Sequence, residues 1–207
     1  MLNWALLVAF VPTFLFVSFT PGMCMTLSMT LGITLGVKRA LWMMLGELVG
    51  VGIVAICAVV GVAAIMLGAP MVFTAFKWLG GAYLAWLGIQ MWQSKGKMAI
   101  PTDANVQPNV SAKALMTQGF VTAIANPKGW AFFMVLLPPF IDESLPMPMQ
   151  LSVLVFMILL IEFSALLSYA SGGQTLSKLL AKSSNVQLLN RISGTLMIGV
   201  AFWLALG

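Results

Sequence analysis

The chain has 207 residues, of which 61% are hydrophobic and only 7% are charged, and its formal net charge is +5. Ordinary soluble domains contain roughly 25% charged residues, so this composition excludes a water-soluble fold. Several apolar runs reach the ~20 residues that a helix needs to cross a hydrocarbon core about 30 Å thick, and none alternates like a barrel strand. We therefore expect an all-α membrane protein whose partner surface is the lipid bilayer and not a nucleic acid.

The first apolar stretch is too long for one straight span. Residues 1–37 carry no charged side chain, yet a cut at Thr20-Pro21-Gly22 leaves two pieces that are too short to cross separately. Proline removes a backbone donor and clashes with the preceding helical turn. We therefore expect a single helix that is broken or strongly kinked at this proline.

Five further spans follow from the remaining apolar runs. They are expected at 41–67, 71–93, 114–140, 149–170 and 192–207, separated by 68–70 and by more polar segments around 94–113, 141–148 and 171–191. The fourth span repeats the oddity of the first, because Asn126-Pro127-Lys128-Gly129 interrupts it. Backbone groups freed inside a membrane are tolerated only within protein or beside water, so we expect both proline breaks in the protein interior.

Positive charges gather in every second connection. The first, third and fifth loops hold Lys38, Arg39, Lys95, Lys97, Lys113, Lys178, Lys182 and Arg191, whereas the other loops and both ends hold no Lys or Arg. Loops rich in Lys and Arg face the cytoplasm. We therefore expect the odd loops inside and both termini outside.

The most polar stretch, residues 94–111, lies at the middle of the chain and divides it into three spans plus three. We expect one transmembrane domain over 1–207, with a first repeat of about 1–93, a cytoplasmic linker of about 94–113 and a second repeat of about 114–207. The repeats would be inverted copies, each opening with a broken helix. In inverted repeats the discontinuous helices meet near the midplane and form the substrate site, which predicts a transporter.

Four charged side chains lie within the predicted spans, and one of them, Lys77 near the outer end of the third span, is expected to snorkel outward. Lys128 is about 14 residues into its span, roughly 21 Å, and Glu162 is at a similar depth in the next span. The two could form a structural ion pair, or Lys128 could serve proton coupling or carboxylate binding. Glu47 is about seven residues into the second span, where it either points to the inner interface or relays protons.

Other chemistries find little support. The two cysteines, Cys24 and Cys57, have no partner at metal-ligand or redox-motif spacing. Met23-Cys24-Met25 offers soft ligands for copper(I), but methionine is also a common filler of irregular interfaces and the chain has no His. We expect no metal and no cofactor. No nucleophile with a base is apparent and the commonest general base is absent, so an enzyme is not expected.

Several segments together resemble the lysine-exporter (LysE) superfamily, in its RhtB branch of homoserine and threonine exporters. The resemblance rests on Thr20-Pro-Gly22, Gly32-Ile-Thr-Leu-Gly36, Lys38-Arg39-Ala40, the run from Lys77-Trp-Leu-Gly80 to Gly88, Asn126-Pro-Lys-Gly-Trp-Ala-Phe-Phe133 and Pro138-Pro139-Phe140. It implies a bacterial inner-membrane carrier that expels amino acids or close analogues in exchange for protons, with the two broken helices lining the path. The family commonly has a second proline where this chain has Met23.

The predicted site comprises the two breaks and the intramembrane ionisable residues: Thr20, Pro21, Gly22, Glu47, Asn126, Pro127, Lys128 and Glu162. Half-helix N-termini would bind the carboxylate of the solute, freed carbonyls its ammonium group, and Lys128 would assist. The alternatives left open are an exporter of metals or other small ions, a thiol-redox conduit that uses Cys24 and Cys57, and a purely structural subunit. A homodimer is also left open.

Overall fold

The computed structural model describes residues 3–95, 110–142 and 144–206, and within them all regular structure is helical. The elements are α1 (Trp4–Ser18), α2 (Met23–Leu35), α3 (Val37–Gly68), α4 (Pro70–Gln93), α5 (Ala112–Ile124), α6 (Pro127–Leu136), the 3₁₀ helix η1 (Pro138–Phe140), α7 (Met147–Ala181) and α8 (Ser183–Leu206). Some side chains inside these helices, including those of Lys77, Pro127 and Lys128, lie outside the described part. The all-α prediction is confirmed.

The first apolar stretch is broken at the predicted place. The axes of α1 and α2 are bent by 60° across residues 19–22. Pro21 has no N–H group, and the N–H of Thr20 turns back to the carbonyl of Val17 at 3.2 Å instead of continuing the α-helical ladder. Gly22, the residue before α2, has an extended backbone, and no side chain caps the start of the helix.

The fourth segment is broken in the same way. Ser111 caps α5, since its Oγ accepts the N–H of Ala114 at 3.2 Å, and the helix ends at Ile124. A new helix, α6, begins at Pro127. Proline suits the first position of a helix, where its missing N–H would have no intrahelical partner. The break at Asn126-Pro127 therefore follows from local chemistry.

Within the described residues, two helices are long and apolar enough to cross a membrane, Val37–Gly61 of α3 and Met147–Gly173 of α7. The bent pair of α1 and α2 adds a third if it counts as one span. The number of six spans stays a prediction. The prediction of a polar loop at 171–191 is wrong. Helix α7 continues past a bend at Gly173 (φ 35°) to Ala181, and α8 starts at Ser183. Polar side chains alone do not end a helix, and no proline lies in that segment.

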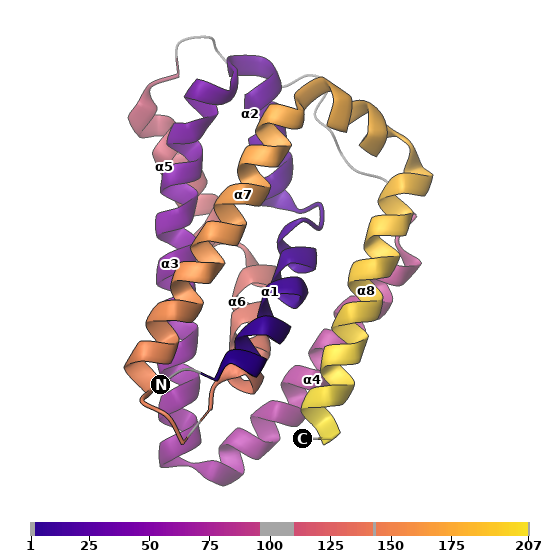
Figure 1. Cartoon of the computed structure of the whole chain (residues 1–207). Coiled ribbons are helices and arrows are strands. Elements are labelled where there is room, and N and C mark those ends of the chain that lie inside the picture. The colour runs from indigo at the N-terminus through magenta and orange to yellow at the C-terminus, as the bar shows by residue number, and fades with distance from the viewer. Residues whose placement is uncertain (1–2, 96–109, 143, 207) are drawn as a thin grey trace.

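The helices pack in three pairs (Figure 1). Parallel pairs form between α2 and α7, where Gly32 lies against the backbone of Ala170, and between α3 and α5, where Gly46 lies against that of Met116. Helices α4 and α8 cross in opposite directions with Gly88 against Gly194. Small residues at these points allow close backbone approach.

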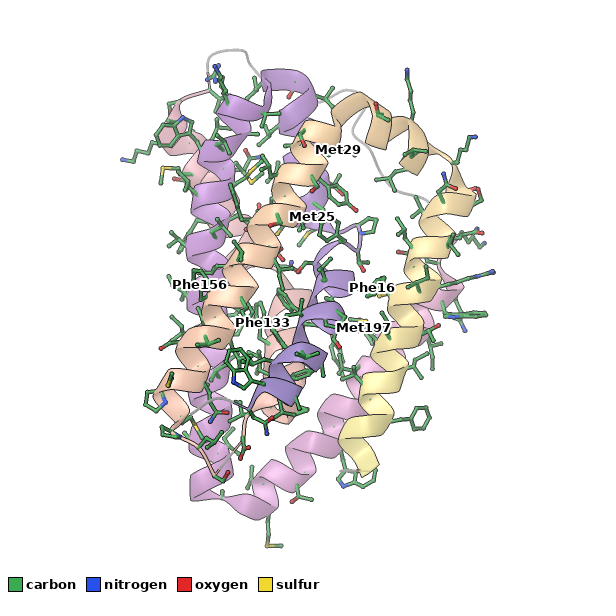
Figure 2. All side chains as sticks on the ribbon, in the orientation of Figure 1. Phe16, Met25, Met29, Phe133, Phe156 and Met197 are labelled. Carbon is green, nitrogen blue, oxygen red and sulfur yellow. The ribbon has the colours of Figure 1, made fainter. Side chains whose placement is uncertain are left out.

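Two buried clusters lie on either side of the helix breaks. One holds Met25, Met29, Met43 and Met44 around α2 and the N-terminal half of α3. The other is centred on phenylalanines of α1, α6 and η1: Phe10, Phe14, Phe132, Phe133 and Phe140. Figure 2 shows Met25 and Met29 in one half of the molecule and Phe133 and Met197 in the other. The breaks therefore lie between two packed layers.

We expect Gly46→Ala to lower the free energy of unfolding by about 1–3 kcal/mol, because its new Cβ would collide with the backbone carbonyl of Met116. Gly61→Ala is the matched control in the same helix, since nothing lies near its Cβ position and the residue is exposed. Thermal denaturation in detergent measures both. Equal stability of the two variants would contradict the close packing of α3 on α5.

Candidate functional site

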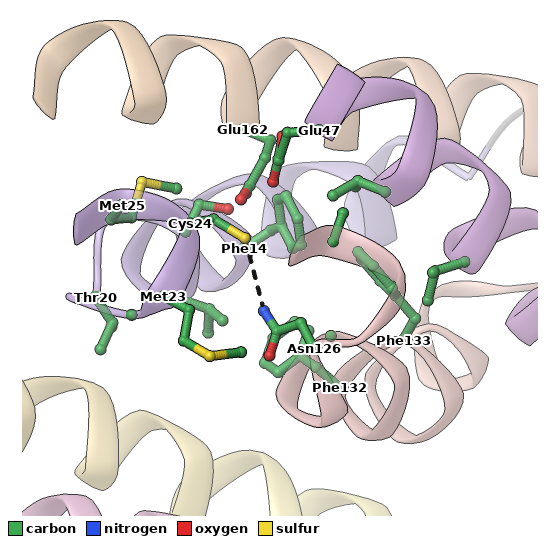
Figure 3. A pocket seen from close by; sticks show the side chains of 17 residues that line it. Phe14, Thr20, Met23, Cys24, Met25, Glu47, Asn126, Phe132, Phe133 and Glu162 are labelled. Atoms are coloured by element: carbon green, nitrogen blue, oxygen red, sulfur yellow. Dashed lines mark hydrogen bonds between the residues drawn. The ribbon is translucent and has the colours of Figure 1, made fainter. Parts of the chain in front are cut away.

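A cavity lies between the two helix breaks (Figure 3). Its residues come from α1, α2, α3, α7 and both sides of the second break. The space open to the centres of water molecules is about 70 Å³, several times the ~10–15 Å³ that a single water needs. The cavity is thus large enough for a polar group of a solute together with water.

Five of the predicted site residues line this cavity, namely Thr20, Gly22, Glu47, Asn126 and Glu162. Pro21 lies in the connection between α1 and α2. The side chains of Pro127 and Lys128 lie outside the described residues, and so does the ion pair predicted between Lys128 and Glu162. The breaks and the two intramembrane glutamates therefore meet at one place.

The carboxylates of Glu47 from α3 and Glu162 from α7 lie next to one another (Figure 3). Glu47 is 0% exposed, so it does not reach the membrane interface, and neither of its carboxylate oxygens has a hydrogen-bond partner among the described residues. Two adjacent negative charges in a low-dielectric interior are costly. The pair is therefore suited to hold a proton or a cationic group.

The two breaks contact each other beside these carboxylates. Asn126 Nδ2 donates to Cys24 Sγ at 3.9 Å, which joins the second break to the first turn of α2. Cys24 is a buried free thiol, whereas Cys57 is a free thiol on the exposed side of α3, so the structure does not join the two as a disulfide. No group of three potential metal-binding side chains occurs within the described ranges.

Hydroxyl groups satisfy the backbone at the first break. Tyr169 of α7 donates its hydroxyl to the carbonyl of Phe19 at 2.8 Å, and the hydroxyl of Thr20 donates to the carbonyl of Phe16 at 2.8 Å. Thr20 is also hydrogen-bonded to the buried hydroxyl of Ser193 from α8. Sequence reasoning missed Tyr169 and Ser193. A tyrosine within an apolar span needs a polar partner and could have been singled out, but Ser193 carried no such signal.

The N-terminal end of α2 supplies the opposite electrostatic character. Gly22, Met23, Cys24 and Met25 line the cavity, and no side chain caps this end of the helix. The first-turn N–H groups of a helix point out of its N-terminus and carry a partial positive charge that favours anions. The cavity thus combines an anion-binding helix end with a pair of carboxylates.

The remaining wall of the cavity is mainly apolar. It includes Phe14, Val17, Val51, Val54, Ala123, Gly129, Phe132 and Phe133, together with the buried hydroxyl-bearing residue Ser18. An apolar wall with a few converging polar groups is typical of a small-molecule site.

We expect Tyr169→Phe to lower the free energy of unfolding by about 1–3 kcal/mol, because it leaves the carbonyl of Phe19 without its donor in a water-poor interior. Tyr83→Phe is the control, since Tyr83 is 36% exposed on α4. Thermal unfolding in the same detergent compares them. If Tyr169→Phe unfolded at the same temperature as Tyr83→Phe, the hydroxyl of Tyr169 would not stabilise the break.

Comparison with known proteins places this sequence in a family. A family model described as "LysE type translocator" matches residues 15–207. The homoserine/homoserine lactone efflux protein of Salmonella typhimurium is 28% identical over 197 residues, covering 95% of this chain and 94% of that protein. The leucine efflux protein of Klebsiella pneumoniae is 29% identical over 117 residues, covering 54% of this chain and 52% of that protein.

An uncharacterized membrane protein of Vibrio cholerae is 28% identical over 165 residues, covering 78% of this chain and 79% of that protein. No solved structure matches the chain significantly. The family match spans both helix breaks and both glutamates, and it confirms the resemblance found in the sequence. This chain is a bacterial membrane protein that belongs to the LysE type translocator family.

Proposed function

We propose that this protein is a secondary transporter that exports amino acids or close analogues across the inner membrane in exchange for protons. The observation that carries the proposal is the pair formed by the buried Glu47 and the half-buried Glu162 in a cavity between two helix breaks. The relatives named for efflux of homoserine, homoserine lactone and leucine support an amino-acid cargo.

In the proposed complex, the ammonium group of the substrate lies at Glu47 and Glu162 and its carboxylate lies at the N-terminus of α2. This refines the expectation that freed carbonyls bind the ammonium group. The proposal is supported by the opposite electrostatic character of the two ends of the cavity. Asn126 and Thr20 supply neutral hydrogen-bonding groups between them.

Coupling of substrate export to proton entry follows from the free-energy cost of leaving two adjacent carboxylates without a positive charge. A substrate ammonium group or a proton can lie between them, and each excludes the other. Outward release of the ammonium group then requires that a proton enters, which is antiport. Lys128, beside Pro127 at the start of α6, is proposed to assist at the substrate carboxylate or to exchange partners with Glu162.

The proposed architecture is six spans in two inverted repeats, about 1–93 and 114–207, joined by a cytoplasmic linker, with both termini outside. The packing supports it. The broken pair of α1 and α2 packs on α7, the long helix of the second half, while the broken pair of α5 and α6 packs on α3, its counterpart in the first half. The third helices of the two halves, α4 and α8, pack on each other.

Transport in proteoliposomes under an imposed pH gradient tests the proposal. We expect Glu47→Gln and Glu162→Gln each to lower gradient-driven transport of homoserine or leucine about 10- to 100-fold, since a charge-assisted contact contributes about 1.5–3 kcal/mol. Glu143→Gln is the control, because it makes the same substitution at the one glutamate outside the cavity pair, and this variant should transport normally.

Two results would contradict the proposal. If both cavity variants, inserted at normal levels, kept the native rate and the native response to the pH gradient, the carboxylate pair would not couple transport to protons. If the native protein moved divalent metal ions and no amino acid, the choice of cargo would be wrong.

A further inference from the structure

One side of the cavity is closed by a cluster of phenylalanine rings. Phe10 stacks on Phe14 with ring centroids 5.3 Å apart and meets the edge of Phe140 at 5.1 Å. Phe14 in turn packs on Phe132 and Phe133, both at 6.0 Å, and these two rings contact each other at 6.3 Å. The rings form a continuous apolar layer.

Phe14 lies at the boundary between this layer and the cavity. It lines the cavity together with Phe132 and Phe133, whereas Phe10 and Phe140 lie behind it. Its side chain is 2% exposed. In Figure 3 its ring lies close to the carboxylates of Glu47 and Glu162. A solute that leaves the carboxylates toward the free end of α1 must therefore pass this ring.

The segments that carry the rings are both next to a break. Phe10 and Phe14 come from α1, which is separated from α2 by the 60° bend, and Phe132 and Phe133 come from α6, which follows the second break. A helix that ends at a break can swing without bending its neighbour in the chain. The ring layer is therefore carried by two short helices that can separate.

The far end of α1 is held by a small polar contact. Asn3 Nδ2 donates to the carboxylate of Asp142 at 2.9 Å, in the turn between η1 and α7. Hydrogen bonds from Ser144, and then from Asn3, hold the pKa of Asp142 below its ordinary value, so the acceptor is ionised at neutral pH. A single, partly buried side-chain contact of this kind can hold this end of α1 in place and still release it.

We propose that Phe14, packed on Phe132 and Phe133, is the gate between the cavity and the outer side of the membrane, and that α1 swings at the 19–22 break to open it. An apolar constriction excludes water and ions until it widens. This inference rests on the proposed function and on the outward orientation of the α1 end.

Accessibility of Cys24 tests the gate without requiring any substrate. Cys24 lies in the cavity and is 5% exposed, and Cys57→Ser removes the exposed thiol. In that background we expect Phe14→Ala to raise the rate at which a charged, membrane-impermeant maleimide labels Cys24 in spheroplasts on the order of tenfold. Phe133→Ala, on the opposite side of the gate, should raise the rate as well.

Phe16→Ala is the matched control. Phe16 is two residues from Phe14 in α1 but is 47% exposed and points away from the ring layer (Figure 2). In Phe16→Ala, Cys24 should be labelled at the same rate as in the Cys57→Ser background. Denatured samples of every variant should label fully. Inverted vesicles, labelled from the other face, should show no increase for Phe14→Ala.

Three results would overturn the gate: unchanged labelling in both Phe14→Ala and Phe133→Ala, an equal increase in Phe16→Ala, or an increase confined to inverted vesicles. If Phe14→Ala is not inserted, Phe133→Ala decides the outcome. Since labelling requires no transport, a protein that shows the expected labelling but exports no amino acid would refute the proposed function and leave the gate standing.

Discussion

A helix that breaks inside a hydrocarbon layer exposes backbone groups that lipid cannot satisfy, and the remainder of this structure depends on that constraint. At the first break the missing partners are supplied by Tyr169, by Thr20 and, through Thr20, by Ser193. At the second break the indole of Trp130 donates to the carbonyl of Ile124 at 2.9 Å. Thr20 and Trp130 lie within six residues of the carbonyls they serve, whereas Tyr169 and Ser193 come from helices distant in the sequence. The first break must therefore be packed against other helices of the bundle.

Central breaks have an electrostatic consequence. The N-terminus of α2 opens into the interior, where its partial positive charge is not screened by bulk water. The carboxylates of Glu47 and Glu162 approach the same cavity from two long helices, α3 and α7, and the bend of α7 at Gly173 lies beyond Glu162. Long helices therefore hold the charged groups, and short helices that end at breaks hold the rings that enclose them. This division suits a site whose access changes while its binding groups stay in place.

Sequence reasoning located the two breaks but left the contacts of the ionisable side chains open, for physical reasons. Proline acts on its own neighbours, so its effect on a helix is readable from the chain. The depth of Glu162 could be estimated from helical rise, but rise does not give the direction in which a side chain points. Glu162 was expected near Lys128, and that contact lies outside the described residues and stays a prediction. The described residues place Glu162 beside Glu47, whose burial the sequence left undecided. Likewise, the polar segment after Gly173 is largely helical, because it contains no proline and polar side chains alone do not prevent a helix.

The sequence by itself determined the all-α membrane class, the two helix breaks, the family and five of the residues that line the cavity, because composition, proline chemistry and motif spacing are local properties. Only the tertiary structure decided that the glutamates face each other, that Tyr169 and Ser193 brace the first break, and that five phenylalanines meet beside the cavity. Those contacts join helices separated by up to 173 positions in the chain. They depend on how helices rotate and cross, which close packing settles for the whole bundle at once.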